Sequence, residues 1–135
     1  MIESSIIFKG VIRVSGLKVV KADEATVLSK AFNNACQALS VSNAQAGRIL
    51  GVNPSTLARN VDKGFSPKSK TGELQLHFIR LYRSLFAIAG GDMTFMNHWF
   101  MTDNTALAGV PAQLCERIDG LLRINDYLDA MRGKI

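Results

Sequence analysis

Cysteines and long apolar runs are scarce in this chain of 135 residues. Its two cysteines, Cys36 and Cys115, are far apart and lie inside apolar helical patterns, so we expect buried thiols in a reducing compartment and no disulfide framework. No apolar run approaches the length that spans a bilayer, and residues 1–14 are too polar and interrupted for a secretory signal peptide. These absences favour a cytoplasmic protein.

Residue groups that carry out catalysis are absent from the sequence as well. His77 and His98 stand singly in apolar helical patterns, without a second ligand at metal spacing, which favours structural histidines. The sequence contains no phosphate-binding loop, nucleophile elbow or dinucleotide fingerprint. The carboxylates of Asp119, Asp126 and Asp129 fit a solvated helix face. We therefore expect a binding protein that is not an enzyme and has no cofactor or metal.

The composition favours one folded unit with a polyanionic partner. Hydrophobic residues make up 47% of the chain and charged residues 20%, which is typical of a folded protein. A chain of this length suffices for one sizeable core. The formal net charge of +5 favours binding to a polyanion, although an ordinary soluble basic protein has the same balance.

Residues 42–50 predict a short helix with a clear beginning and end. Ser42 or Asn43 can accept hydrogen bonds from the free amides of its first turn. Gly51 follows the helix directly, and glycine reaches a positive φ without steric cost, so the helix ends there. Apolar or small residues recur at helical spacing along one face: Ala46, Ile49 and Leu50.

A second helix is predicted over residues 55–63, immediately after a forced turn. Asn53 supplies a cap and Pro54 a first-turn proline, and Leu57 and Val61 form the inner face. Together the two helices resemble a helix-turn-helix, with Gly47 at their close crossing, where alanine is common and where either small residue preserves the packing. The outward side chains can reach base edges or phosphates in a major groove: Ser55, Thr56, Arg59 and Asn60. The alternative is a helical corner that touches no nucleic acid.

Positive charge is concentrated on this segment and the loop that follows it. Residues 42–72 carry five basic side chains against Asp62 alone, whereas residues 73–135 carry six basic and seven acidic ones. A phosphate-binding surface requires such a local excess. The five basic residues are Arg48, Arg59, Lys63, Lys68 and Lys70. The predicted DNA-contacting residues are Ser55, Thr56, Arg59, Asn60, Lys63, Lys68 and Lys70.

Helical patterns cover most of the remaining sequence. Asp23 is expected to cap a helix with a broad apolar stripe, and residues 64–72 have the composition of a loop. Residues 73–89 are apolar on more than one side, so this helix is either the hub that joins the two halves or a dimer contact. Further helices are expected over residues 93–101, 111–114 and 117–131. The apolar face of the last is predicted to comprise Ile118, Leu121, Leu122, Ile124, Leu128 and Met131.

The predicted fold is therefore all-α. Residues 1–22 are rich in β-branched side chains broken by Gly10 and Gly16, which suits a short extended arm or hairpin. Such an arm either packs on a neighbouring subunit or is a frayed tail. We expect three parts: an N-terminal arm (1–22), a helix-turn-helix domain (23–72) and a small helical domain (73–135) packed against it.

The second half of the chain contains a distinctive series of short motifs. They are Trp99-Phe100, residues 104–111 (NTALAGVP), Asp119-Gly120-Leu121 and Tyr127-Leu128-Asp129. Together they resemble the toxin-binding domain of the Xre/MbcA/ParS antitoxins, over residues 73–131. That domain typically shows a tryptophan, an asparagine, an Ala-Leu-x-Gly step, a proline-led turn and a glycine before the final helix, and the family also carries an Xre-like helix-turn-helix. Asp103 departs from the pattern because many relatives have proline there, and the helix between Pro111 and Gly120 is shortened.

The resemblance implies an antitoxin that neutralises a RES-domain toxin, which degrades NAD, and represses its own operon. We expect a homodimer, because two helix-turn-helix units related by a twofold axis match a palindromic operator, and a hetero-oligomer with the toxin. The resemblance further implies that the end of the last helix and the tail obstruct the toxin's active site, with charged side chains entering a pocket that normally receives phosphates. From the residues alone, Asn104 can hold a turn through its own backbone and Leu107 can anchor the loop. The expected toxin-binding residues are Asn104, Leu107, Tyr127, Arg132 and Lys134.

Two other functions fit the same sequence. The chain can be a stand-alone helix-turn-helix regulator whose second half only dimerises. It can also be a helical adaptor in which the corner contacts protein alone. Operator binding that falls steeply with salt separates DNA binders from the adaptor, and the toxicity of the neighbouring open reading frame separates the antitoxin from the regulator.

Overall fold

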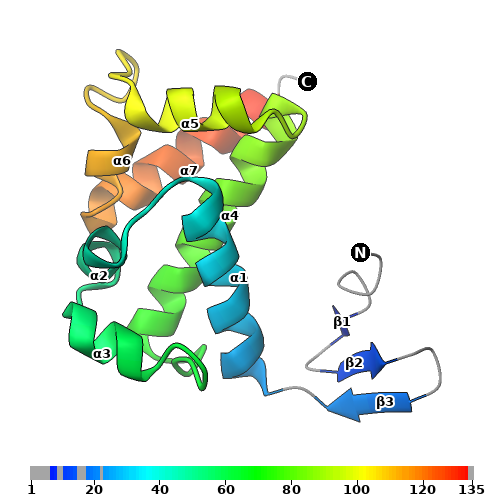
Figure 1. Cartoon of the computed structure of the whole chain (residues 1–135). Helices are drawn as coiled ribbons and strands as arrows, with labels where there is room; N and C mark the ends of the chain where they lie inside the picture. Colours follow the sequence, from blue (N-terminus) through cyan, green and yellow to red (C-terminus); the bar gives the residue numbers. More distant parts are fainter. Residues whose placement is uncertain (1–6, 9–10, 15–17, 22, 134–135) are drawn as a thin grey trace.

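The computed structural model describes residues 7–8, 11–14, 18–21 and 23–133, and seven helices form the body of this part of the chain (Figure 1). The expected all-α fold is confirmed. The helices are α1 (Glu24–Ala38), α2 (Asn43–Leu50), α3 (Pro54–Arg59), α4 (Lys70–Ala89), α5 (Met93–Met101), α6 (Pro111–Leu114) and α7 (Ile118–Gly133). No helix of the described residues has both the length and the apolar content needed to cross a membrane.

A small antiparallel sheet precedes the helices, in the region expected to be extended. Its strands β1 (Ile7–Phe8), β2 (Val11–Val14) and β3 (Lys18–Lys21) pair in sequence order. Phe8 lies opposite Val11, and Val11 in turn lies opposite Lys21. The sheet lies beyond the N-terminal end of α1 (Figure 1). Its predicted role as an arm on a neighbouring subunit stays a prediction.

Helix α4 is the element against which the other helices pack. It contacts α1, α2, α5 and α7, which confirms the hub predicted from its apolar sequence. Ser69 caps its first turn by accepting a hydrogen bond from the Gly72 amide at 3.0 Å, so α4 begins three residues before the predicted start. As a result, Lys70 belongs to the helix and not to the preceding loop.

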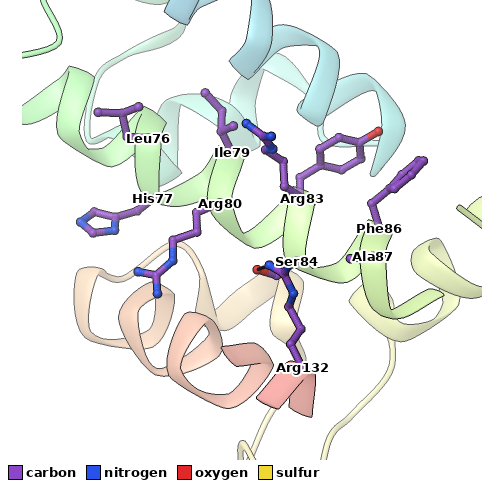
Figure 2. Close-up of a pocket in the computed structure, with 10 residues that line it drawn as sticks. Leu76, His77, Ile79, Arg80, Arg83, Ser84, Phe86, Ala87 and Arg132 are labelled. Carbon is purple, nitrogen blue, oxygen red and sulfur yellow. Dashed lines mark hydrogen bonds between the residues drawn. The ribbon is translucent and has the colours of Figure 1, made fainter. Parts of the chain in front are cut away.

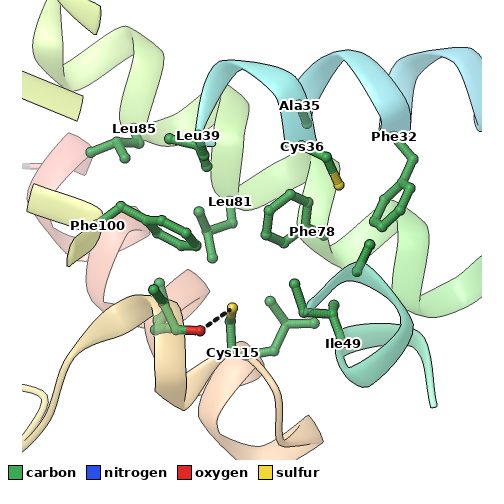
Figure 3. Packing of buried hydrophobic residues seen from close by; sticks show 14 of the residues in the cluster. Phe32, Ala35, Cys36, Leu39, Ile49, Phe78, Leu81, Leu85, Phe100 and Cys115 are labelled. Carbon is green, nitrogen blue, oxygen red and sulfur yellow. Dashed lines mark hydrogen bonds between the residues drawn. The ribbon is translucent and has the colours of Figure 1, made fainter. Parts of the chain in front are cut away.

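A chain of aromatic rings runs through the core and joins three helices (Figure 3). Phe78 of α4 packs edge-on against Phe32 of α1 at a centroid distance of 5.6 Å, and against Phe100 of α5 at 6.3 Å. All three rings are buried. Such edge-to-face pairs stabilise beyond the area they bury, so the two halves of the chain share one core.

Both cysteines lie in this core, as predicted. Cys36 of α1 and Cys115, which follows α6, are buried and free. Burial raises the pKa of each thiol to about 12, because the apolar surroundings disfavour the thiolate. Both side chains are therefore neutral near pH 7 and serve as small apolar packing groups.

The predicted helix-turn-helix is present with the expected caps. Ser42 Oγ accepts from the Gln45 amide at 3.1 Å, and Asn53 Oδ1 accepts from the Thr56 amide at 2.8 Å. Gly51 adopts a φ of +72° and ends α2, while Pro54 opens α3. The predicted starts of both helices and the predicted turn between them are therefore confirmed.

Two predictions about this motif are wrong. α3 ends at Arg59 and not near Lys63, because the Asn60 and Val61 amides bond to carbonyls three residues back, which tightens the helix into a turn. The turn rotates Val61 outward, so its side chain is half-exposed and not on the inner face. Ser29 Oγ of α1 holds this turn by donating to the Val61 carbonyl at 2.8 Å.

Two further expectations need correction. Asp23 precedes α1, but its side chain caps no backbone amide; it accepts a hydrogen bond from Thr26 Oγ1 at 3.2 Å. The apolar face of α7 is narrower than predicted, because Leu121, Ile124 and Leu128 make its buried contact. The other apolar residues predicted for that face, Ile118, Leu122 and Met131, are exposed.

Gly47 lies at the crossing of α2 and the turn, where the backbones approach closely. A Cβ added at Gly47 would lie 2.6 Å from the Val52 carbonyl oxygen, far inside van der Waals contact. The interpretation that alanine would preserve this packing is therefore wrong, since the obstacle is backbone and not a flexible side chain.

We predict that Gly47→Ala lowers the free energy of unfolding by about 1–3 kcal/mol, because the added methyl group forces the turn away from α2. This loss would outweigh the gain in helix propensity of about 1 kcal/mol that alanine brings. Gly133→Ala is the matched control, since a Cβ at Gly133 meets no atom within 4 Å. Urea unfolding monitored by circular dichroism measures both, and equal stability of the two variants would contradict the prediction.

Candidate functional site

The first candidate surface is the outer side of α3. Ser55 and Arg59 are exposed and Thr56 is partly exposed, as a surface for DNA requires. Arg59 Nη2 donates to Thr56 Oγ1 at 3.3 Å, so the two side chains lie together. Asn60 Nδ2 donates to the Thr56 carbonyl at 2.7 Å; this side chain satisfies the end of its own helix.

The predicted basic residues around α3 differ in their surroundings. Lys63, Lys68 and Lys70 are exposed, and Lys70 Nζ lies 3.5 Å from Glu73 Oε1. Arg48 was counted with this positive charge, but its Nε donates to Glu116 Oε1 at 2.9 Å. Arg48 therefore connects the helix-turn-helix to the second half of the chain.

Polar contacts fix the helix-turn-helix against the second half in addition to the shared core. Gln45 Nε2 donates to the Ala112 carbonyl of α6 at 2.9 Å, next to the Arg48 pair. On the other side, Asn97 Nδ2 of α5 donates to the Ala38 carbonyl at the end of α1 at 2.9 Å. The first half of the chain is thus held against the second at two separate places, through α2 and through α1.

The second candidate surface surrounds the loop between α5 and α6. Asn104 closes this loop as expected: its Oδ1 accepts from the Leu107 amide at 3.1 Å, and its backbone pairs with Gly109 in an isolated bridge. Leu107 is buried, and its carbonyl accepts a hydrogen bond from Arg123 of α7. Leu107 therefore anchors the loop from inside, and the loop surface is formed by its neighbours.

Tyr127 of α7 stacks on Trp99 of α5, with centroids 6.4 Å apart and planes inclined by 19°. Both rings are partly buried, so they join the two helices and still present an edge to solvent. Trp99 is therefore packed against the core and is not a free recognition side chain.

The end of α7 lies against the end of α4, at a different place from the Asn104 loop. Arg132 Nη1 donates to Ser84 Oγ at 3.2 Å, and one turn earlier Asp129 pairs with Arg80. Arg132, Arg80 and Ser84 line a hollow of about 850 Å³ along α4 (Figure 2). Lys134 lies outside the described residues.

Sequence reasoning missed part of this hollow. It described residues 73–89 only as apolar on more than one side and did not single out Leu76, Ile79, Arg80, Arg83 or Phe86 as site residues. These residues line one continuous depression. The available signal was the spacing of Leu76, Ile79, Arg83 and Phe86 at steps of three, four and three residues.

Among the residues that the structure describes, no group of three or more His, Cys, Asp or Glu side chains could hold a metal ion. The two surfaces consist of hydrogen-bonding, cationic and apolar side chains, which suit the recognition of other macromolecules.

The fold and these two surfaces define a helix-turn-helix protein with a second helical binding domain. The sequence matches two family models, the antitoxin Xre-like helix-turn-helix domain over residues 18–80 and the antitoxin Xre/MbcA/ParS C-terminal toxin-binding domain over residues 84–134. A comparison with curated proteins found no match.

The chain belongs to the Xre/MbcA/ParS antitoxins, which confirms the resemblance stated from the sequence. It therefore joins a DNA-binding domain to a toxin-binding domain. The first match ends at residue 80 and the second begins at residue 84, so both of these boundaries fall inside α4, which spans Lys70–Ala89. The predicted division at residues 72 and 73 stays a prediction.

We predict that Asn104→Ala lowers the free energy of unfolding by about 1 kcal/mol, because the variant loses the side-chain acceptor that closes the loop. Asn104→Asp is the matched control, since its carboxylate can accept the same bond from the Leu107 amide. Thermal unfolding measures both variants. If Asn104→Ala unfolds at the temperature of the original protein, the side chain does not hold the loop.

Proposed function

We propose that this antitoxin represses its own operon through α3 and neutralises a RES-type, NAD-degrading toxin by obstructing its active site. The observation that carries the proposal is the placement of two different surfaces on one rigid body. The outer side of α3 lies at one end of the molecule, and the end of α7 lies at the other (Figure 1).

The DNA half of the proposal rests on exposure and charge. Ser55, Thr56 and Arg59 form the base-reading group on α3, because a helix of this motif enters the major groove with such side chains outward. Lys63, Lys68 and Lys70 contact backbone phosphates from the following turn and loop. Asn60 contributes through its amide oxygen and its second Nδ2 hydrogen, since the first is bonded to the Thr56 carbonyl.

Dimerisation belongs to this half of the proposal. A single helix-turn-helix covers a short half-site, and two copies related by a twofold axis match a palindromic operator. The protein thus acts on DNA as a homodimer and forms a hetero-oligomer with its toxin.

The toxin half of the proposal rests on the C-terminal end. Arg132 is exposed at the last turn of α7. A single hydrogen bond joins its side chain to Ser84. Together with Lys134, Arg132 supplies positive charge for a pocket that receives the phosphates of NAD. Asn104 and Leu107 shape the loop between α5 and α6 from within, at a separate place on the same domain, and Tyr127 of α7 stacks on Trp99 there.

We expect Arg59→Ala to weaken operator binding by about 1–3 kcal/mol, because it removes a side chain that reads a base edge. Fluorescence anisotropy with DNA from upstream of the gene measures the affinity, at two salt concentrations. Arg59→Lys distinguishes a base contact from a phosphate contact, since lysine keeps the positive charge but lacks the bidentate guanidinium group. Unchanged operator binding by Arg59→Ala would contradict the assignment, and insensitivity to salt would exclude phosphate contacts altogether.

A chain truncated after Met131 should inhibit the toxin more weakly, by a factor of about ten or more, because it lacks the charged end that enters the toxin's pocket. The readout is NAD loss caused by the product of the neighbouring open reading frame, which we propose is the RES-type toxin. Operator binding by the same truncated chain serves as the folding control and should not change. If the truncated chain inhibits NAD loss as well as the full chain does, the obstructing segment lies elsewhere.

A further inference from the structure

One face of α4 carries an unusual line of side chains. Leu76, Ile79, Arg83 and Phe86 follow one another at steps of three, four and three residues, so they lie along one side of the helix. We call these four residues the α4 seam. Ten residues of helix separate its ends, which corresponds to about 15 Å, enough for two to three turns of a second helix.

The seam lies at the bottom of two hollows that adjoin one another. One, of about 850 Å³, is bounded by Arg132 of α7, and the other, of about 400 Å³, by Pro67 and by Ala31 of α1. Leu76, Ile79 and Arg83 line both. The result is one groove that runs along α4 between α1 and the end of α7. Figure 2 shows the residues that line the larger hollow.

The groove exposes apolar side chains that a folded protein usually covers. Leu76 is 49% and Phe86 45% exposed, although both lie on the helix that supplies the centre of the core. Such residues on one line, with a packed helix on either side, have the pattern of a surface that receives an amphipathic helix.

The charge of the groove selects among its possible occupants. Three guanidinium groups line it, those of Arg80, Arg83 and Arg132, against the carboxylate of Glu24. Asp129 already pairs with Arg80. Within the described part of the chain, no carboxylate lies within 4 Å of Arg83.

A second copy of the chain fits this charge poorly. Two seams packed together would bring Arg80 and Arg83 of both protomers into one interface, where like charges repel. An occupant with acidic residues beside its apolar stripe would instead pair with Arg83 and compete for Arg80. Charge complementarity therefore favours an acidic partner helix.

We propose that the α4 seam binds an amphipathic, acidic helix of the toxin. This inference rests on the proposed function, and it extends the toxin contact from the end of α7 along α4. The groove crosses from residues matched by the toxin-binding domain to residues matched by the helix-turn-helix domain. The toxin would thus contact both domains.

The test is titration calorimetry of the proposed RES-type toxin, the product of the neighbouring open reading frame, in a catalytically inactive form, against the full-length antitoxin. Arg83→Glu and Leu76→Ser should each weaken toxin binding about tenfold or more, since they remove the central charge and an apolar anchor of the seam. Lys30→Glu is the matched control, because it makes the same change of charge at an exposed site of α1 outside the groove, and it should stay within about twofold. Circular dichroism confirms that each variant folds.

Three other results would contradict the proposed toxin site on the seam, and each identifies a different error. If Arg83→Glu and Leu76→Ser bind the toxin as tightly as Lys30→Glu while the unaltered antitoxin still inhibits NAD loss, the seam is not the toxin site and the proposed function stands. If the two variants change from dimer to monomer in light scattering with unchanged toxin affinity, a second copy occupies the groove. If the unaltered antitoxin neither binds nor inhibits the RES-domain protein, the proposed function fails together with the inference.

Discussion

The packing of Phe78 between Phe32 and Phe100 is the interaction on which the rest of this structure depends. Phe78 is buried at the middle of α4, and its two partners come from the helix before the helix-turn-helix and from the first helix after α4. Because α4 runs without a break through both family domains, the domains have one core and cannot rotate independently without opening it. The Arg48–Glu116 and Asn97–Ala38 contacts hold the same arrangement from two sides.

This shared core explains why α4 is apolar on more than one side. One side faces α1, another faces α5 and α7, and between them remains the seam, of which Leu76 and Phe86 are exposed. Exposed apolar side chains on the central helix carry a cost in solubility. A partner that covers it in the cell accounts for its presence better than stability does, since the core is already complete without Leu76 and Phe86.

The parts of this protein that were predictable from its sequence are those set by local chemistry. Ser42, Gly51 and Asn53–Pro54 determine the helix-turn-helix because caps and turns act within four residues. The errors arose where distant segments decide. Val61 turns outward because the helix tightens into a turn after Arg59 and Ser29 holds that turn. Ile118 stays exposed because the rest of the protein covers a narrower face of α7 than its apolar sequence suggests. Arg48 was counted with the positive charge around the helix-turn-helix, because no local signal in the sequence reveals its partner Glu116, 68 residues away.

The geometry also bears on how the two proposed activities combine. The outer side of α3 and the end of α7 lie at opposite ends of the molecule, so contacts confined to those ends would not interfere directly. The groove along α4 changes this, because Pro67 at its margin belongs to the same loop as Lys68, a proposed phosphate contact. A helix seated on the seam would reach that loop. Toxin binding would then alter DNA affinity through the position of one loop, without any rearrangement of the core that joins the domains.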